Sequence, residues 1–122
     1  MESSSSNIIL DKSFTFSVRI IRLYQWLKKN HKDIDSLAKQ ILRGGTSIGA
    51  NVEEAVGAFS RKEFASKIGI SYKEARETLY WLRLLKATDY LDEKQYNSIY
   101  SDCDEIKKIL ASILKTTKEN ND

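Results

Sequence analysis

The sequence predicts an all-α protein folded as an antiparallel up-down-up-down four-helix bundle, and three observations support this prediction. Four segments place apolar residues at alternating steps of three and four, which puts the side chains on one stripe of an α-helix and matches the period of a left-handed bundle. The 122 residues include no proline, so few positions force a helix to break. Only a few residues separate consecutive segments, and such short connections favour antiparallel neighbours.

The serine-rich segment over residues 1–10 is expected to be a disordered or extended tail, and the bundle to occupy residues 11–117. Either Asp11 or Ser13 is able to cap the first helix. The main apolar stripe of this helix consists of Phe16, Ile20, Leu23 and Leu27. Further apolar residues widen the stripe beyond what one partner helix covers: Phe14, Val18, Ile21 and Tyr24, with Trp26 further round. The helix is therefore either buried between two neighbours or also faces another subunit, and the sequence leaves both interpretations open.

The helix expected over residues 34–58 contains three glycines in its interior. Its apolar stripe consists of Ile34, Ala38, Ile41, Gly45, Ile48, Val52, Ala55 and Phe59. Gly44, Gly45 and Gly49 each cost about 1 kcal/mol relative to alanine in an exposed helix, so their presence needs a structural reason. We consider two reasons: the close approach of another backbone, within the chain or at a subunit interface, and a local kink.

The remaining two helices begin with sequence signals for capping. Ser60, with Glu63 three residues later, forms a capping box and opens a helix that ends near Thr88 or Asp89. Asp92, with Gln95 three residues on, caps a last helix that continues to residue 117, and residues 118–122 are expected to form a second disordered tail. The third apolar stripe is Phe64, Ile68, Ser71, Ala75, Thr78, Leu82 and Leu85, and the fourth is Tyr96, Ile99, Cys103, Ile106, Leu110 and Ile113.

Charge and cysteine content bound the environment and the partners. The net charge is +3 and the pI is about 8.9, which permits contact with nucleic acid or with an anionic membrane but requires neither. A single cysteine excludes an internal disulfide framework and fits a reducing compartment. Residues 1–10 lack the pattern of a signal peptide, and no apolar run approaches the roughly 20 residues that a membrane span requires. We therefore expect a cytoplasmic protein without a membrane partner.

The sequence offers little to an enzyme. A di-iron bundle requires Glu-x-x-His pairs, whereas the only histidine, His31, falls in a turn. One histidine and one cysteine are too few for a zinc site. Cys103 occupies a core position, which favours a small buried hydrophobic residue over a nucleophile. We predict a protein that is not an enzyme and uses no metal or cofactor.

One group of polar residues lies at the edge of the apolar stripes. Ser47, Asn51 and Glu54 follow each other at steps of four and three, and Ser71 and Glu74 are able to face them from the next helix. A buried polar group without a partner costs about 1–3 kcal/mol, so these groups must find partners. An interhelical hydrogen-bond network that fixes register is the favoured interpretation. A subunit contact and a ligand or catalytic site are the alternatives.

The clearest functional signal is a line of residues on the outward side of the helix that follows Ser60. The line has the same four-three spacing as the core stripe but lies opposite to it, and it consists of Lys62, Ser66, Gly69, Lys73, Arg76, Tyr80 and Arg83. Its cations are suited to the phosphates of a nucleic acid, and Tyr80 offers a face on which a base stacks. The alternative is a solvated charged face that neighbours such as Glu77 neutralise.

Three segments of the chain resemble a known bacterial family. They read Ser47-Ile48-Gly49-Ala50-Asn51-Val52-Glu53-Glu54-Ala55, then Glu63-Phe64, then Ser71-Tyr72-Lys73-Glu74. This pattern resembles that of the four-helix-bundle proteins named 23S ribosomal-RNA intervening-sequence proteins, although Ala55 stands where the family often has glycine and Val52 where it often has isoleucine. The resemblance implies a bundle that assembles into a ring-shaped homopentamer. Related bundles serve as accessory variability proteins of diversity-generating retroelements and resemble basic nucleic-acid-binding barrels.

Together these observations favour a non-enzymatic helical bundle that self-assembles and binds structured RNA or DNA through basic faces. Lys62, Lys73, Arg76 and Arg83 are expected to contact phosphates. The alternative is a protein-interaction scaffold with no nucleic-acid role, in which the broad apolar arc of the first helix meets a different protein.

Overall fold

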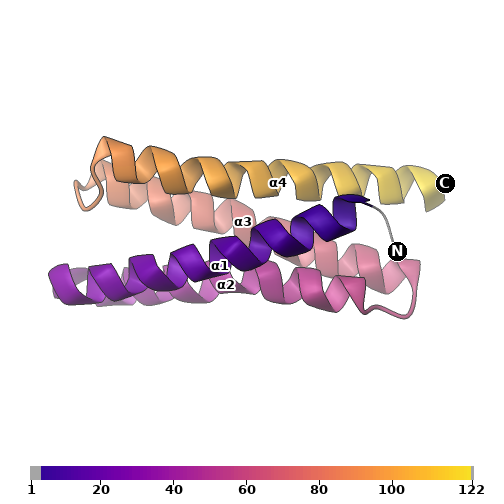
Figure 1. Ribbon diagram of the computed structural model, residues 1–122, viewed down its shortest axis with the longest axis horizontal. Helices are drawn as coiled ribbons and strands as arrows, with labels where there is room; N and C mark the ends of the chain where they lie inside the picture. The colour runs from indigo at the N-terminus through magenta and orange to yellow at the C-terminus, as the bar shows by residue number, and fades with distance from the viewer. Residues whose placement is uncertain (1–3, 122) are drawn as a thin grey trace.

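The computed structural model describes residues 4–121, and these residues form four long α-helices joined by short turns (Figure 1). The elements are α1 (Ser4–Asn30), the short 3₁₀-helix η1 (Lys32–Ile34), α2 (Asp35–Val56), α3 (Arg61–Ala87) and α4 (Glu93–Asn121). Consecutive helices run in opposite directions, and the main contacts are α1 with α2, α2 with α3 and α3 with α4. A smaller contact between α1 and α4 closes the bundle. The predicted all-α four-helix bundle is confirmed.

The outer two helices are longer than the sequence analysis predicted. α1 begins at Ser4 instead of near Asp11 or Ser13, because Ile9 is buried in the core and continues the stripe of Phe16 and Ile20 toward the N-terminus. Ser13 is itself buried within the helix and donates a hydrogen bond to the carbonyl oxygen of Leu10. The tail predicted over residues 1–10 is therefore wrong for residues 4–10, and residues 1–3 lie outside the described part of the chain.

α4 likewise continues past its predicted end at residue 117 to Asn121. The hydroxyl of Thr117 donates to the carbonyl oxygen of Ile113 one turn earlier and so takes part in the helix instead of ending it. The tail predicted over residues 118–122 is thus helical as far as residue 121, and residue 122 lies outside the described part.

The predicted caps at the starts of α3 and α4 are confirmed, although within the described residues only the second forms both hydrogen bonds of a capping box. The hydroxyl of Ser60 accepts a hydrogen bond of 3.0 Å from the backbone N–H of Glu63 at the start of α3. At the start of α4, Asp92 and Gln95 each accept a hydrogen bond from the backbone N–H of the other, at 2.7 and 2.9 Å. These side chains satisfy backbone donors that have no partner within the helix.

The core contains nearly all of the predicted apolar stripes. Its largest fully buried side chains are Phe16, Phe64, Ile9, Ile20, Leu27, Ile41, Ile48, Ile68, Leu82, Leu85, Ile106 and Leu110. Phe59 is an exception: its side chain is 97% exposed, because α2 ends at Val56 and Phe59 lies in the turn before α3. The other predicted stripe residues that are only partly buried are Leu23, Ile34, Tyr96 and Ile113.

The three glycines of α2 face neighbouring helices of the same chain. A Cβ atom at Gly45 would lie 2.7 and 2.8 Å from the two γ-carbons of Ile20 on α1. One at Gly49 would lie 3.2 Å from the carbonyl oxygen of Ser13, and one at Gly44 would lie 3.3 Å from the hydroxyl of Thr78 on α3. All three are buried inside this chain, so close approach within the chain accounts for them, and an interface between subunits is not needed to explain them.

At one end of the bundle an aromatic cluster joins the two turns. The ring of His31 lies edge-on to Trp26 at 5.2 Å and to Tyr90 at 5.0 Å between ring centroids. The hydroxyl of Tyr90 also donates a hydrogen bond to the carboxylate of Asp33. The Trp26–His31–Tyr90 cluster therefore connects the α1–α2 turn to the α3–α4 turn, and it accounts for the position of Trp26.

Replacing Gly45 by alanine is expected to lower the free energy of unfolding by about 1–3 kcal/mol, because the new methyl group would overlap the branched side chain of Ile20. Gly69→Ala is the matched control. No atom lies within 4 Å of its added Cβ, so alanine there should raise the free energy of unfolding by up to about 1 kcal/mol. Urea denaturation measures both, and a Gly45→Ala variant as stable as the wild type would contradict the packing described.

Candidate functional site

The predicted basic line lies on the exposed side of α3. Its four cations, Lys62, Lys73, Arg76 and Arg83, and the aromatic Tyr80 are all exposed to solvent. Their position follows from the helical period, because the buried residues of α3 occupy the opposite side and pack against α2 and α4. Of the two small residues in the line, Ser66 is exposed and Gly69 is half-buried.

Within the described residues, no ion pair joins any of these four cations to a carboxylate. Glu77, which the alternative interpretation offered as a neutralising neighbour, makes no such pair either. The charges of α3 that face α2 behave differently. Lys67 contacts Glu54 at 2.9 Å, and Glu74 lies 3.8 Å from Arg43. The charged side chains of α3 that face α2 are therefore paired, whereas Lys62, Lys73, Arg76 and Arg83 form no ion pair in the part of the chain that the structure describes.

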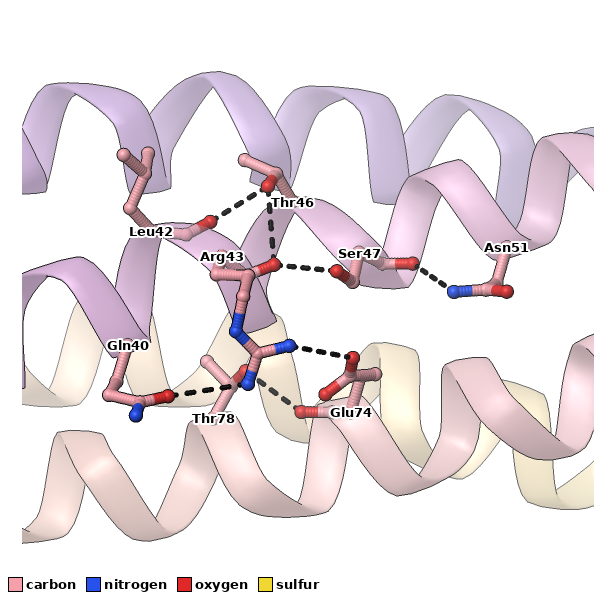
Figure 2. A network of polar contacts seen from close by, with 8 residues as sticks. All are labelled: Gln40, Leu42, Arg43, Thr46, Ser47, Asn51, Glu74 and Thr78. Carbon is pink, nitrogen blue, oxygen red and sulfur yellow. Dashed lines mark hydrogen bonds and ion pairs between the residues drawn. The ribbon is translucent and has the colours of Figure 1, made fainter.

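The balance of charge along α3 strengthens this contrast. The helix contains seven basic and three acidic residues. One of the three, Glu63, lies in the first turn, where a negative charge is favoured by the helix dipole. Another, Glu74, is directed toward Arg43 of α2 (Figure 2). The exposed side of α3 consequently carries more basic than acidic side chains, and Glu77 is the remaining acidic residue of the helix.

Aromatic side chains accompany the cations. The guanidinium of Arg76 lies over the ring of Tyr72 at 5.9 Å, and Tyr80, which is 50% exposed, packs edge-on against Trp81 at 5.3 Å. The line predicted from the sequence includes Tyr80 but not Tyr72. The signal was present, because Tyr72 and Arg76 stand four residues apart and therefore meet on one helix face.

The polar group on α2 uses its own helix for part of its hydrogen bonding (Figure 2). The hydroxyl of Ser47 donates a hydrogen bond of 2.7 Å to the backbone carbonyl oxygen of Arg43. The side-chain amide of Asn51 donates a hydrogen bond of 2.8 Å to the backbone carbonyl oxygen of Ser47. Neither side chain bonds across to α3 in the described residues. For these two positions, hydrogen bonding within α2 replaces the predicted interhelical network.

Three other contacts join α2 to α3. The buried hydroxyl of Ser71 donates a hydrogen bond of 2.8 Å to the carbonyl oxygen of Ile48. The two cross-helix ion pairs, Glu54 with Lys67 and Glu74 with Arg43, lie on either side of it. The predicted residues Ser71, Glu54 and Glu74 therefore do bridge the helices, but their partners are a backbone carbonyl and two cations that the sequence analysis did not include.

Cys103 lies in the core, as predicted. Its thiol is directed at the carbonyl oxygen of Ala75 on α3 at 3.6 Å, and burial raises the pKa of this thiol to about 12. The reactive thiolate form is therefore scarce at neutral pH. Over residues 4–121 no group of three or more His, Cys, Asp or Glu side chains is placed to hold a metal ion.

No helix in the described part of the chain is both long enough and apolar enough to cross a membrane. This finding agrees with the absence of a long apolar run noted in the sequence.

Comparison with known proteins identifies relatives of known structure. The family model described as 23S rRNA-intervening sequence protein matches residues 5–112. A crystal structure of a protein of unknown function from the S23 ribosomal protein family of Bacteroides thetaiotaomicron is 50% identical in sequence and has a TM-score of 0.86. That match covers 91% of this chain and 98% of the other. No curated protein matches the chain.

The hydrogen bond from the Ser71 hydroxyl to the backbone of α2 is expected to stabilise the fold, whereas the hydrogen bond from the Ser47 hydroxyl is expected to contribute little. Ser71→Ala should lower the free energy of unfolding by about 0.5–1.5 kcal/mol, because it removes a buried interhelical hydrogen bond. Ser47→Ala removes only a bond within one helix and should change stability by less than about 0.5 kcal/mol. Thermal or urea unfolding compares the two, and equal effects would show that Ser71 does not join the helices.

Proposed function

The chain belongs to the family of 23S rRNA-intervening sequence proteins, and from that premise we propose a non-enzymatic, self-assembling helical bundle that binds structured RNA or DNA. Family membership does not supply the activity, since the related crystal structure is of a protein whose function is unknown. The proposal depends instead on one observation, the line of cations on the outer face of α3 that have no carboxylate partner in the described residues.

The dimensions of this line suit a nucleic-acid backbone. Lys62 and Arg83 are separated by about 31 Å along the helix axis, at about 1.5 Å per residue. A nucleic-acid strand presents one phosphate per roughly 3.4 Å of helix axis, so several phosphates pass within reach of the line. Cations already held in ion pairs must first release their carboxylates, but Lys73, Arg76 and Arg83 are able to bind phosphate without that cost.

The apolar side of α1 supports self-assembly. Phe14 is 67% exposed, Ile21 42% and Val18 37%, so the described part of the chain covers the second stripe of α1 only in part. These three side chains recur at steps of four and three and form one continuous strip, which a second copy would shield from water. A ring of five, as the family resemblance implies, would present five α3 faces and raise the effective concentration of each weak contact.

The same apolar strip also favours the alternative function, a scaffold that binds a different protein. The two functions differ in ligand: the scaffold needs the strip of α1 and makes no use of the cations on α3. In either role we place the protein in the cytoplasm, in keeping with its single, buried cysteine.

Replacing both Arg76 and Arg83 by alanine is expected to weaken binding to a structured RNA or a DNA duplex and to flatten its salt dependence. The slope of log affinity against log salt should fall by about 2 units, one per lost phosphate contact. Fluorescence anisotropy at several salt concentrations measures it.

The matched control for this pair is Lys12→Ala with Lys39→Ala, which removes the same charge from cations that are already paired with Glu105 and Asp35. If the control lowers the affinity and the salt slope as much as the α3 variant does, binding depends only on the net charge of the protein. That result would contradict the assignment of binding to the outer face of α3. Absence of binding by the wild type, even at low salt, would overturn the nucleic-acid role.

Ile21→Glu is expected to convert an assembled wild-type protein into a monomer of 14.0 kDa, because the new charge would be buried in the interface. Ile70→Glu on α3 is the control, since Ile70 is 41% exposed and Ile21 42%. Sedimentation or light scattering at micromolar concentration gives the mass. A wild-type monomer, or dissociation by Ile70→Glu alone, would contradict assembly through α1.

A further inference from the structure

We propose that the outer surface shared by α3 and α4 is a binding site for unpaired nucleobases, so that the preferred ligand is a single-stranded segment and not a continuous duplex. The inference rests on the proposed nucleic-acid function and specifies the ligand of its site. We refer to the residues concerned as the tyrosine strip, which comprises Tyr72, Arg76, Tyr80 and Arg83 of α3 together with Tyr96 and Tyr100 of α4.

The register of α3 against α4 brings these residues together. The contact between Cys103 and the carbonyl oxygen of Ala75 fixes one level of the antiparallel pair. Because α3 and α4 are antiparallel, a residue seven positions before Cys103 lies level with a residue seven positions after Ala75. Tyr96 therefore lies level with Leu82, in the turn of α3 that contains Arg83. By the same count Tyr100 lies level with the segment between Arg76 and Tyr80.

Arg83 of α3 also lies within electrostatic reach of Tyr96 of α4. Partial burial raises the pKa of the Tyr96 hydroxyl, and the neighbouring Tyr100 acts in the same direction. The positive charge of Arg83 opposes both effects, which requires its guanidinium to lie within electrostatic reach of the hydroxyl. The α3 cations and the α4 tyrosines therefore belong to one surface.

The aromatic rings of the strip are held in place by their neighbours. The rings of Tyr96 and Tyr100 pack at 5.1 Å between centroids with a tilt of 38°. Tyr80 rests edge-on against Trp81, and Tyr72 lies beneath Arg76. Rings that are already ordered lose little conformational freedom on binding, so stacking of a base on them costs less entropy.

The charges around the strip favour an anion. On α4, Asp104 lies near the strip, but it is bonded to Lys107 at 3.2 Å and to Lys108 at 3.0 Å. The hydrogen bond from Lys108 and then that from Lys107 lower the pKa of this carboxyl, and together the two lysines more than compensate its charge. The phosphates of a strand that follows the tyrosines therefore meet a positive surface.

Flat rings alternating with arginines match unpaired bases better than a duplex. Within a duplex the base faces are covered by stacking, and only the edges are open in the grooves. Aromatic and guanidinium planes instead bind the faces of splayed bases with little sequence preference. Arg76 and Arg83 are about 10.5 Å apart along the helix, which corresponds to roughly three nucleotides at 3.4 Å each.

The test uses the full-length protein with two fluorescent probes, a single-stranded uridine 12-mer and a blunt RNA duplex. Tyr80→Leu and Tyr100→Leu keep apolar volume but remove the ring. Each is expected to weaken binding of the single strand about ten-fold, through the loss of one stacked base, and to change duplex binding less than two-fold. The wild type is expected to prefer the single strand.

Phe59→Leu is the matched control, because it also replaces an exposed ring by leucine, but Phe59 is 97% exposed in the α2–α3 turn, outside the tyrosine strip and the apolar strip of α1. Circular dichroism verifies that each variant is folded. Because the Tyr80 side chain is 50% exposed, its replacement should leave the core intact, so Tyr80→Leu tests the proposal without Tyr100→Leu.

The outcomes separate the two proposals. If Tyr80→Leu weakens single-strand binding no more than Phe59→Leu does, or if the wild type prefers the duplex, the tyrosine strip is not a base-binding site. Salt-dependent binding through Arg76 and Arg83 would in that case still support the proposed function. If the wild type binds neither probe at low salt, both proposals fail together.

Discussion

The close packing of α1 against α2 is the constraint on which the rest of the structure depends. Gly45 accommodates the branched side chain of Ile20, and Gly49 lies against the backbone around Ser13, so α1 and α2 approach each other closely at these points. Phe16 and Ile20 of α1 are both fully buried in the core. The close approach also determines what α1 cannot bury: with one side pressed against α2, the strip that contains Phe14 is left outside.

A second consequence concerns α3, which combines two separate roles on two sides. Its inner side is joined to α2 by a buried hydroxyl and two ion pairs and to α4 by apolar packing. Its outer side contains cations that form no ion pair in the described part of the chain. The charged residues that stabilise the bundle are distinct from those proposed to bind phosphate. Binding of a ligand therefore does not require the ion pairs between α2 and α3 to break.

Local patterns were sufficient to predict the four helices, most of the core and the side-chain caps of α3 and α4, because these depend on the spacing and type of nearby residues. They failed at Ser4–Leu10, where a serine-rich composition suggested a tail although Ile9 continues the apolar stripe. They also assigned Ser47 and Asn51 to an interhelical network. A sequence places a polar group on a face, but whether its partner is a neighbouring helix or the carbonyl one turn earlier depends on distances that only the packed structure sets. The relation of Tyr96 to Arg83 required the register of two helices in the same way.

The Trp26–His31–Tyr90 cluster makes the two ends of the bundle unequal. It joins both turns at one end, whereas the opposite end contains the α2–α3 turn, with Phe59 fully in solvent, and the outer ends of α1 and α4 (Figure 1). We therefore expect the helices to fray first at the end without the cluster, where amide hydrogens should exchange before those beside His31. On this expectation α1 and α4 separate first at their outer ends, while the contacts of His31 keep the two turns together at the other end.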